Sequence, residues 1–307
     1  SRSAVAAARS FRPDIVQVEY LQLAHCLRDL RRWRDGRGGE RAPRLVLESH
    51  ELGSLPRRRR AATAAWPRRA WLRAEAGAWD RLARDASRWA DATLCVTDQD
   101  RELSEQVGGR NLVTVPLGVD TRGLSCERDA EPATRVLFVG SFQHPPNRDA
   151  ARLLCRRIWP AVAPRLPGWE LVLAGPGSDT FLAQLGAPHE GIRATGFVDD
   201  LTDQFRRSAI FAAPLAEGGV IKIKILEAMA RGIPVVTTPI GAEGITDRAQ
   251  DLVAWADDPD SFATALVETA QRPEDASRRA RRARRYVAEH FSWDAVVARL
   301  ERVYRGA

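Results

Sequence analysis

The stretch "AIFAAPLAEGGVIKIKILEAMARGIPVVTTPI", residues 209–240, predicts a strand, a glycine-containing loop, a helix and a second strand. An apolar run ends at Pro214, and beyond Val220 the apolar residues recur at the spacing of a helix with one buried face. Gly232 and Pro234 are typical of a helix C-terminus, and the β-branched residues after them predict the next strand. A strand–helix–strand unit of this kind builds parallel sheets.

The same alternation extends in both directions along the chain. Short apolar runs predict ten strands, at 14–20, 44–50, 93–98, 112–118, 135–141, 170–175, 192–198, 209–215, 234–240 and 251–256. Helical patterns cover 59–90, 147–163, 200–208, 220–231 and 259–271, and two further helices fill 274–306. Strands that alternate with helices predict an α/β fold with two Rossmann-like parallel sheets.

A polar connector at 116–134 divides the chain into two halves. We predict a first domain over 1–125, a second over 126–275, and C-terminal helices over 276–307 that cross back. The first half has four predicted strands, too few for the architecture of the second. The chain also opens on Ser1 and has its only methionine at position 229, so we expect the first domain to lack its N-terminal part.

The composition indicates a globular protein, with 44% hydrophobic and 28% charged residues. No apolar run reaches the roughly 18 to 20 residues of a membrane span. The four cysteines show no paired spacing, which favours a reduced, cytoplasmic setting. A net charge of +7 is compatible with nucleic acid, an anionic membrane surface or a phosphorylated ligand as partner.

Both lysines of the chain, Lys222 and Lys224, lie at the predicted start of one helix. Cations at a helix N-terminus oppose the helix dipole, so a compensating anion is expected. One interpretation is structural: Glu227 pairs with Lys224 inside the helix, or Glu217 compensates from just before it. The other is a phosphate-bearing ligand, because unpaired backbone N–H groups at a helix N-terminus bind anions.

The residues between the strand and this helix favour the ligand. Gly218 and Gly219 have no side chain and would let a ligand approach the backbone closely. In an open α/β sheet the crevice at the carboxyl ends of the strands is where ligands bind. We therefore predict a binding site that includes Gly218, Gly219, Val220, Lys222 and Lys224.

The segment 218–245 resembles the donor-binding segment of the group 1 (family 4) nucleotide-sugar glycosyltransferases, which have the two-domain GT-B fold. Four further segments resemble that family: "ADATLCVTDQDREL" (90–103), "VPLGVDT" (115–121), "VLFVGSFQHPPNRDA" (136–150) and "AEHFSWDAVVARLERVY" (288–304). The resemblance covers nearly the whole chain. It implies a hexosyltransferase with retaining transfer from a nucleoside diphosphate sugar, in cell-surface polysaccharide or glycolipid assembly, without a cofactor or catalytic metal.

The resemblance also implies roles for individual residues. Glu227 matches the second glutamate of the family's E-x7-E motif and would bind the ribose of the nucleotide. The first glutamate of that motif would fall at position 219, where this chain has Gly219, so the usual contact to the sugar is missing.

A second departure from the family concerns the diphosphate. The resemblance places Gly140 and Ser141 among the donor-binding residues. After Gly140 the family commonly has an arginine and, five residues later, a lysine, but this chain has Ser141 and Pro146 there. We expect Lys222 and Lys224 to replace those cations, with Arg148 as a weaker candidate.

A histidine at the end of a first-half strand, His50 in "LVLESHE", resembles the family's histidine that faces the donor sugar. We predict a catalytic role for His50 together with Lys222, and regard Glu51 as a weaker candidate. A capping or solvent-facing histidine is the alternative. The histidines and cysteines show no metal-ligand spacing.

The segment 57–90 places Trp66, Trp71, Trp79 and Trp89 among many arginines. It predicts either a helix packed on its domain with a hydrated arginine face, or attachment to an anionic membrane surface.

We thus expect a nucleotide-sugar donor, a glycan or lipid-linked acceptor, and no nucleic acid as partner. The expected location is the cytoplasm, where the chain could attach to the inner face of the membrane. The alternative functions are a non-catalytic nucleotide-sugar or polyanion binding module, or an inactive fragment.

Overall fold

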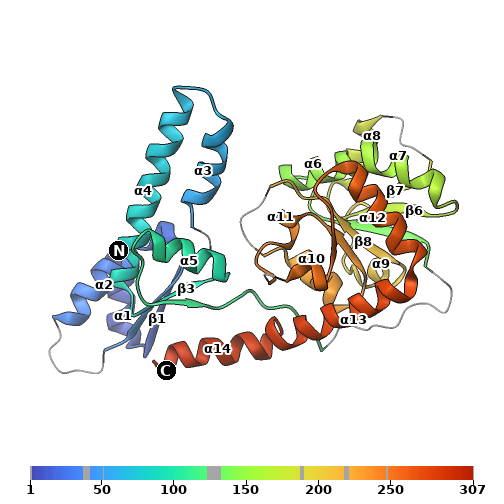
Figure 1. The fold of residues 1–307 in the computed structure, drawn as a ribbon. Coiled ribbons are helices and arrows are strands. Elements are labelled where there is room, and N and C mark those ends of the chain that lie inside the picture. The colour runs from blue at the N-terminus through green and yellow to red at the C-terminus, as the bar shows by residue number, and fades with distance from the viewer. Residues whose placement is uncertain are drawn as a thin grey trace. The chain divides into compact units, whose positions relative to one another are not determined.

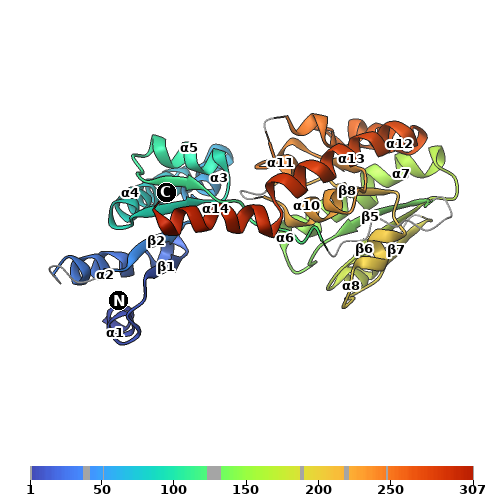
Figure 2. The ribbon, with the colours of Figure 1, turned by 90° about the horizontal axis from the view of Figure 1, so that it is seen from below.

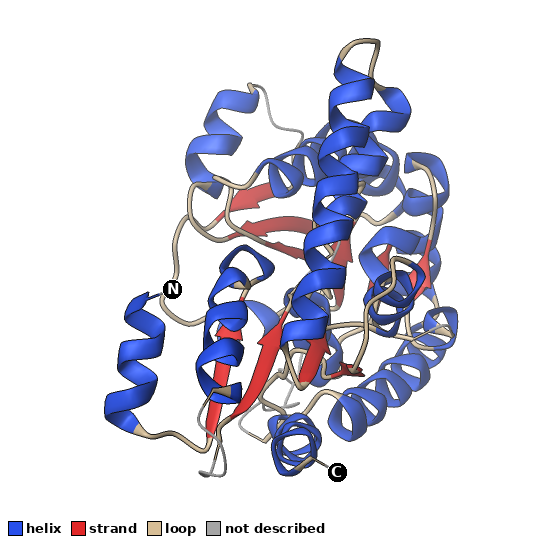
Figure 3. Ribbon diagram, turned by 90° about the vertical axis from the view of Figure 1, so that its left-hand side faces the viewer, coloured by secondary structure: helices blue, strands red, loops and turns tan. Residues whose placement is uncertain are grey.

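The computed structural model describes residues 2–36, 42–50, 52–122, 133–186, 190–217, 221–246 and 248–306. The chain forms two compact units, Ser1–Leu117 with Val296–Ala307, and Gly118–Ala295. Each unit contains one sheet of parallel strands (Figure 3). The predicted α/β fold with two parallel sheets is therefore confirmed.

The division of the chain differs from the predicted domain limits. The chain passes from the first unit to the second between Leu117 and Gly118. The predicted limit at 125/126 lies in a segment outside the described residues. Residues 276–295, predicted to be part of a separate C-terminal segment, belong to the second unit. They do so because α13 (Pro273–His290) packs against α10 and α12 of that unit, as Figure 2 shows for α12.

The first unit is built on a four-stranded sheet of order β1–β2–β3–β4. Its strands are β1 (Ile15–Glu19), β2 (Arg44–Glu48), β3 (Ala92–Cys95) and β4 (Leu112–Thr114). Its helices before the linker are α1 (Arg2–Phe11), α2 (His25–Asp35), α3 (Ser54–Thr63), α4 (Arg68–Trp89) and α5 (Asp98–Gln106).

Alternation along β2 supplies both faces of this sheet with core residues. Leu45 and Leu47 face one side, where α2 and α4 pack on them. Val46 faces the other side, where it packs with Val296 and Val303 of α14 (Trp293–Arg305). The last helix therefore completes the core of the first unit, and the expected crossing back of the C-terminal helices is confirmed.

The segment expected as one helical stretch at 59–90 is an antiparallel hairpin of α3 and α4 (Figure 1). The chain turns between them because Ala64 is extended, with ψ 145°. Pro67 then lies directly before α4, where its missing N–H costs no helical hydrogen bond.

The second unit has a six-stranded sheet of order β10–β9–β8–β5–β6–β7, as expected from its six predicted strands. The strands are β5 (Arg135–Val139), β6 (Glu170–Ala174), β7 (Ile192–Ala194), β8 (Ile210–Ala213), β9 (Val235–Thr237) and β10 (Ala254–Trp255). This is the doubly wound order, in which the chain reverses direction across the sheet between β5 and β8.

The helices of the second unit cover both faces of its sheet. They are α6 (Pro145–Leu153), α7 (Trp159–Val162), α8 (Ser178–Leu185), α9 (Thr202–Arg206), α10 (Ile223–Ala230), α11 (Pro239–Ala242) and α12 (Pro259–Gln271), besides α13. The central strands β5 and β8 are buried apart from Arg135 at the start of β5, as expected of parallel strands between two helical layers. Within the described ranges of the chain, no helix is both long enough and apolar enough to span a bilayer.

Candidate functional site

The candidate site of the second unit lies where the chain reverses direction, at the carboxyl ends of β5 and β8. Gly140 and Ser141 follow β5 directly. Helix α10 follows β8 and carries Lys222 at its N-cap and Lys224 in its first turn. The structure thus brings these four predicted residues to the edge of the sheet at which doubly wound folds bind ligands.

Helix α10 begins at Ile223, so the start predicted near Val220 is wrong. The reason is the extended backbone of Lys222, with φ −91° and ψ 96°. Its carbonyl oxygen accepts from the backbone N–H groups of Ile225 (2.8 Å) and Leu226 (3.2 Å). Gly218, Gly219 and Val220 lie outside the described residues.

Lys224 ties α10 to the loop after β5. Its Nζ donates to the carbonyl oxygen of Val139 (3.0 Å) and to Oδ1 of Asn147 (2.5 Å). The ammonium group also lies 4.8 Å from the centroid of the Phe138 ring, a favourable cation–π contact. Among the residues that the structure describes, no ion pair joins Lys224 to Glu227, so the structural interpretation by intrahelical pairing finds no support.

Asn147 is a residue that the sequence analysis missed. Its Nδ2 donates to the carbonyl oxygen of Ser141 (3.0 Å) while its Oδ1 accepts from Lys224. A Cβ at Gly140 would lie 2.8 Å from Cγ of Asn147, so this strand end requires glycine. The only available signal was the position of Asn147 in "HPPNRDA", among the segments that resemble the family.

Two positive charges therefore meet at this strand end. Burial, and to a smaller extent the charge of Lys222, lower the pKa of Lys224 to about 8. A bound anion would stabilise the protonated ammonium and relieve this repulsion. The electrostatics of the site suit a ligand with several negative charges, such as a diphosphate.

This pKa predicts a pH-dependent affinity for a nucleoside diphosphate. Lys224 is protonated below about pH 8, and an anion raises its pKa in the complex, so affinity should fall as the pH rises through about 8. The fall can approach about tenfold per pH unit for one linked proton. Calorimetric titration with GDP between about pH 7.5 and 9.5 measures it. Lys224→Met should bind more weakly and show no such fall; an unchanged slope in this variant would contradict the assignment.

Glu227 lies half-buried on α10, one turn after Lys224. Burial raises the pKa of its carboxyl group, and the nearby Arg231 opposes that rise. A carboxylate in this position is able to accept hydrogen bonds from two neighbouring hydroxyl groups. Of the weaker candidates, Arg148 is exposed on α6 and Glu217 is exposed before the undescribed segment.

In the first unit, His50 lies just after β2 in a constrained conformation. Its φ of 54° is in the left-handed region, which costs a residue with a Cβ about 1 to 2 kcal/mol. Its ring stacks on Tyr20, with centroids 4.2 Å apart and planes 22° apart. Tyr20, after β1, also has a positive φ, of 67°. Strained residues of this kind gather at functional sites.

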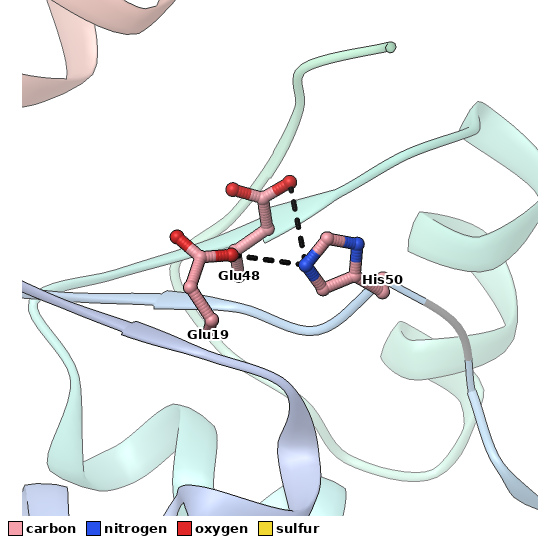
Figure 4. A group of neighbouring side chains, drawn as sticks. All are labelled: Glu19, Glu48 and His50. Carbon is pink, nitrogen blue, oxygen red and sulfur yellow. Dashed lines mark hydrogen bonds and ion pairs between the residues drawn. The ribbon is translucent and has the colours of Figure 1, made fainter.

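Two carboxylates surround His50 (Figure 4). Its Nε2 lies 2.9 Å from Oε2 of Glu19 and 3.9 Å from Oε1 of Glu48. Gln17 joins the two carboxylates, because its Nε2 donates to Glu19 (2.7 Å) and Glu48 (3.0 Å). The hydroxyl of Tyr304 on α14 donates to Oε1 of Gln17 (2.6 Å). A simple capping or solvent-facing histidine does not account for this network.

Glu19, Glu48 and His50 each offer one ligand atom, and these atoms all lie within 4.8 Å of one another. The group is therefore able to hold a divalent cation. Burial and the charge of Glu19 raise the pKa of Glu48. The sequence analysis missed this cluster because its members come from two different strands. Glu51, the weaker candidate beside His50, lies outside the described residues.

The comparisons with known proteins agree with this architecture. The family described as "Glycosyl transferases group 1" matches residues 133–272. A GDP-mannose-dependent alpha-(1-6)-phosphatidylinositol dimannoside mannosyltransferase of Mycobacterium tuberculosis is 32% identical, over 94% of this chain and 73% of its own length. A phosphatidyl-myo-inositol mannosyltransferase of Mycolicibacterium smegmatis is 29% identical over 69% of this chain, which spans 56% of that relative.

Solved structures share the fold. Sucrose-phosphate synthase from Thermosynechococcus elongatus matches 98% of this chain and 75% of its own length, with a TM-score of 0.72 and 17% identity. A protein from Anabaena, solved in complex with UDP and glucose, matches 100% of this chain and 81% of its own length, with a TM-score of 0.68 and 14% identity.

Proposed function

This chain belongs to the group 1 glycosyltransferases, and on that premise we propose that it moves a hexose from a nucleoside diphosphate sugar to a lipid-linked or glycan acceptor. The observation that carries the proposal is the pair of lysines at the reversal point of the second sheet. Lys224 is anchored to the β5 loop and Lys222 caps the same helix. The donor diphosphate would be stabilised by both positive charges and would offset the repulsion between them.

In the proposed complex, Lys222 and Lys224 neutralise the diphosphate. Glu227 accepts hydrogen bonds from the ribose hydroxyls. Charge that develops on the departing diphosphate would be stabilised by these preplaced cations, and this stabilisation is the main catalytic effect that the site can supply. The configuration at the sugar carbon is retained, as the family resemblance implies.

His50 is the proposed catalytic residue of the first unit. Because a carboxylate can only accept, the contact with Glu19 requires that Nε2 of His50 carries a proton. Nδ1 is then the nitrogen that remains to interact with a hydroxyl group of the sugar. We propose that transfer proceeds without a metal ion, so a chelator should leave it intact.

GDP-mannose is the first donor to test and a phosphoinositide glycolipid the first acceptor. The support is the mycobacterial relative at 32% identity, whose name specifies GDP-mannose and phosphatidylinositol dimannoside. UDP-glucose is the second donor, because a similar fold has been solved with UDP and glucose. A lipid-held acceptor would place the chain at the inner face of a membrane, with 57–90 as the proposed attachment segment.

The rival function is a non-catalytic module that binds nucleotide sugars or polyanions. The net charge of +7 and the glycine at position 219 favour it. Salt dependence separates the two functions, because a general polyanion binder loses affinity steeply with salt and ignores the base.

A donor panel tests the proposal directly. Thermal unfolding is followed with GDP, UDP, ADP, their nucleotide sugars, and the 2′- and 3′-deoxy forms of each nucleoside diphosphate. Transfer to a phosphoinositide glycolipid is assayed with and without EDTA. We expect the diphosphate of one base to stabilise the chain selectively, and its deoxy forms to stabilise it less. Transfer should continue in the presence of EDTA. Equal stabilisation by all bases would contradict donor binding; selective binding without transfer would indicate the rival module.

A further inference from the structure

Charge is segregated along the α3–α4 hairpin. Its tip, which we define as residues 58–74, contains no aspartate or glutamate and carries six arginines, Arg58, Arg59, Arg60, Arg68, Arg69 and Arg73. The acidic partners lie at the base of the hairpin, where Arg57 pairs with Glu75 at 2.7 Å and Arg58 reaches Asp80 at 2.5 Å. Arg60, Arg68 and Arg73 lie farther out and are exposed. The hairpin tip is therefore strongly basic.

The tryptophans of the hairpin divide in the same way. Trp79 and Trp89, near the base, pack on the core of the first unit. Trp66 and Trp71, in the hairpin tip, are 81% and 63% exposed. A helix packed on its own domain with a hydrated arginine face explains the first two tryptophans. It leaves unexplained why two large aromatic side chains face water at the tip.

The hairpin tip is held together by packing between α3 and α4, and it exposes these side chains. Ala61 of α3 and Leu72 of α4 are buried, at 3% and 4% exposure. The two helices pack along their length in the antiparallel arrangement of Figure 1. Nε of Arg69 also donates to the carbonyl oxygen of Ala64 in the turn (2.9 Å), which holds the start of α4 against the end of α3.

We propose that the hairpin tip docks on an anionic lipid bilayer by inserting Trp66 and Trp71 among the headgroups. Indole rings favour the interface between water and hydrocarbon, and arginines around them attract anionic headgroups. Two exposed indoles within a basic tip favour a bilayer over duplex nucleic acid, whose phosphates would need only the arginines. This inference rests on the proposed function for its lipid-held acceptor, and it adds which residues bind and how.

The two contributions respond differently to salt, so they can be separated. The test is co-sedimentation of the full 307-residue chain with phosphatidylcholine vesicles that contain about one third phosphatidylglycerol, at about 50 and 300 mM salt. Trp66→Ala/Trp71→Ala should bind at low salt but lose about tenfold or more at high salt, where ionic attraction is screened. Arg60→Gln/Arg68→Gln/Arg73→Gln should lose about tenfold or more at low salt.

Matched controls remove the same residue types elsewhere. Trp255→Ala removes a 43% exposed tryptophan of the second unit. Arg281→Gln/Arg284→Gln/Arg285→Gln removes three exposed arginines of α13. Both controls should bind vesicles like the unmodified chain.

Three outcomes would overturn the proposal: tip variants that bind normally, controls that lose as much as tip variants, or equal binding to pure phosphatidylcholine. Stabilisation by GDP, UDP and ADP is measured on the same samples, and stabilisation by any one of them counts as donor binding. Stabilisation without vesicle binding defeats this inference and leaves the proposed function standing. Vesicle binding without stabilisation defeats the proposed function and leaves the hairpin inference standing.

Discussion

Lys222→Ala should weaken the binding of GDP or UDP by about 10- to 100-fold and leave the binding of the free nucleoside within about twofold. A hydrogen bond to a charged group contributes about 1.5 to 3 kcal/mol, which corresponds to this range. The fold should persist, because α10 is capped by the backbone carbonyl of Lys222 and not by its side chain. Calorimetry with nucleoside diphosphate and nucleoside, side by side, measures the difference.

The same variant has a second readout. The charge of Lys222 contributes to the lowered pKa of Lys224, so its removal should shift the fall in affinity to a pH above about 8. Arg152→Ala, which removes a half-exposed cation from α6, is the control and should change neither quantity. Equal losses for nucleoside and diphosphate, with an unmoved pH profile, would show that Lys222 does not contact phosphate.

His50→Ala should lower the turnover number of sugar transfer by about 100-fold or more, the usual contribution of a positioned catalytic histidine. Affinity for the nucleoside diphosphate should change less than twofold, because His50 and the lysines belong to different compact units. Steady-state kinetics with GDP-mannose, paired with calorimetry, separates the two effects.

Two companions make this result interpretable. His50→Asn keeps a residue that tolerates the positive φ, so it removes the imidazole while preserving the backbone, and it should be as inactive as His50→Ala. His25→Ala removes an exposed histidine of α2 and should retain full turnover. An active His50→Asn would assign the loss in His50→Ala to the backbone and refute a chemical role for the imidazole.

The local pattern of apolar residues was sufficient to predict most of the fold. All ten strands found in the described residues were predicted, because buried parallel strands are short apolar runs. Helix breaks such as the one at Gly232 follow from local chemistry. The start of α10 was wrong by three residues because a backbone conformation at Lys222 decides it, and several residue types at that position would allow either start.

The partners of the site residues were not predictable in the same way. Asn147 meets Lys224 across 77 positions of sequence, and Glu19 meets His50 across 31. These contacts depend on which strands become neighbours and in which register, and neither the spacing nor the type of the residues contains that information. The lysines themselves were found because their position opposes the helix dipole, which is a local conflict that the sequence displays.

The position of α14 in the sequence, after the second unit, has a consequence for biosynthesis. Val296 and Val303, the side chains that cover Val46, are synthesised only after the whole of the second unit. The first unit therefore cannot finish burying that face of its sheet before α14 is made, while the second unit, contiguous from Gly118 to Ala295, can complete its core first. For these two units the expected order of core completion is the reverse of the order of synthesis, and a nascent chain would expose an apolar sheet face until α14 emerges.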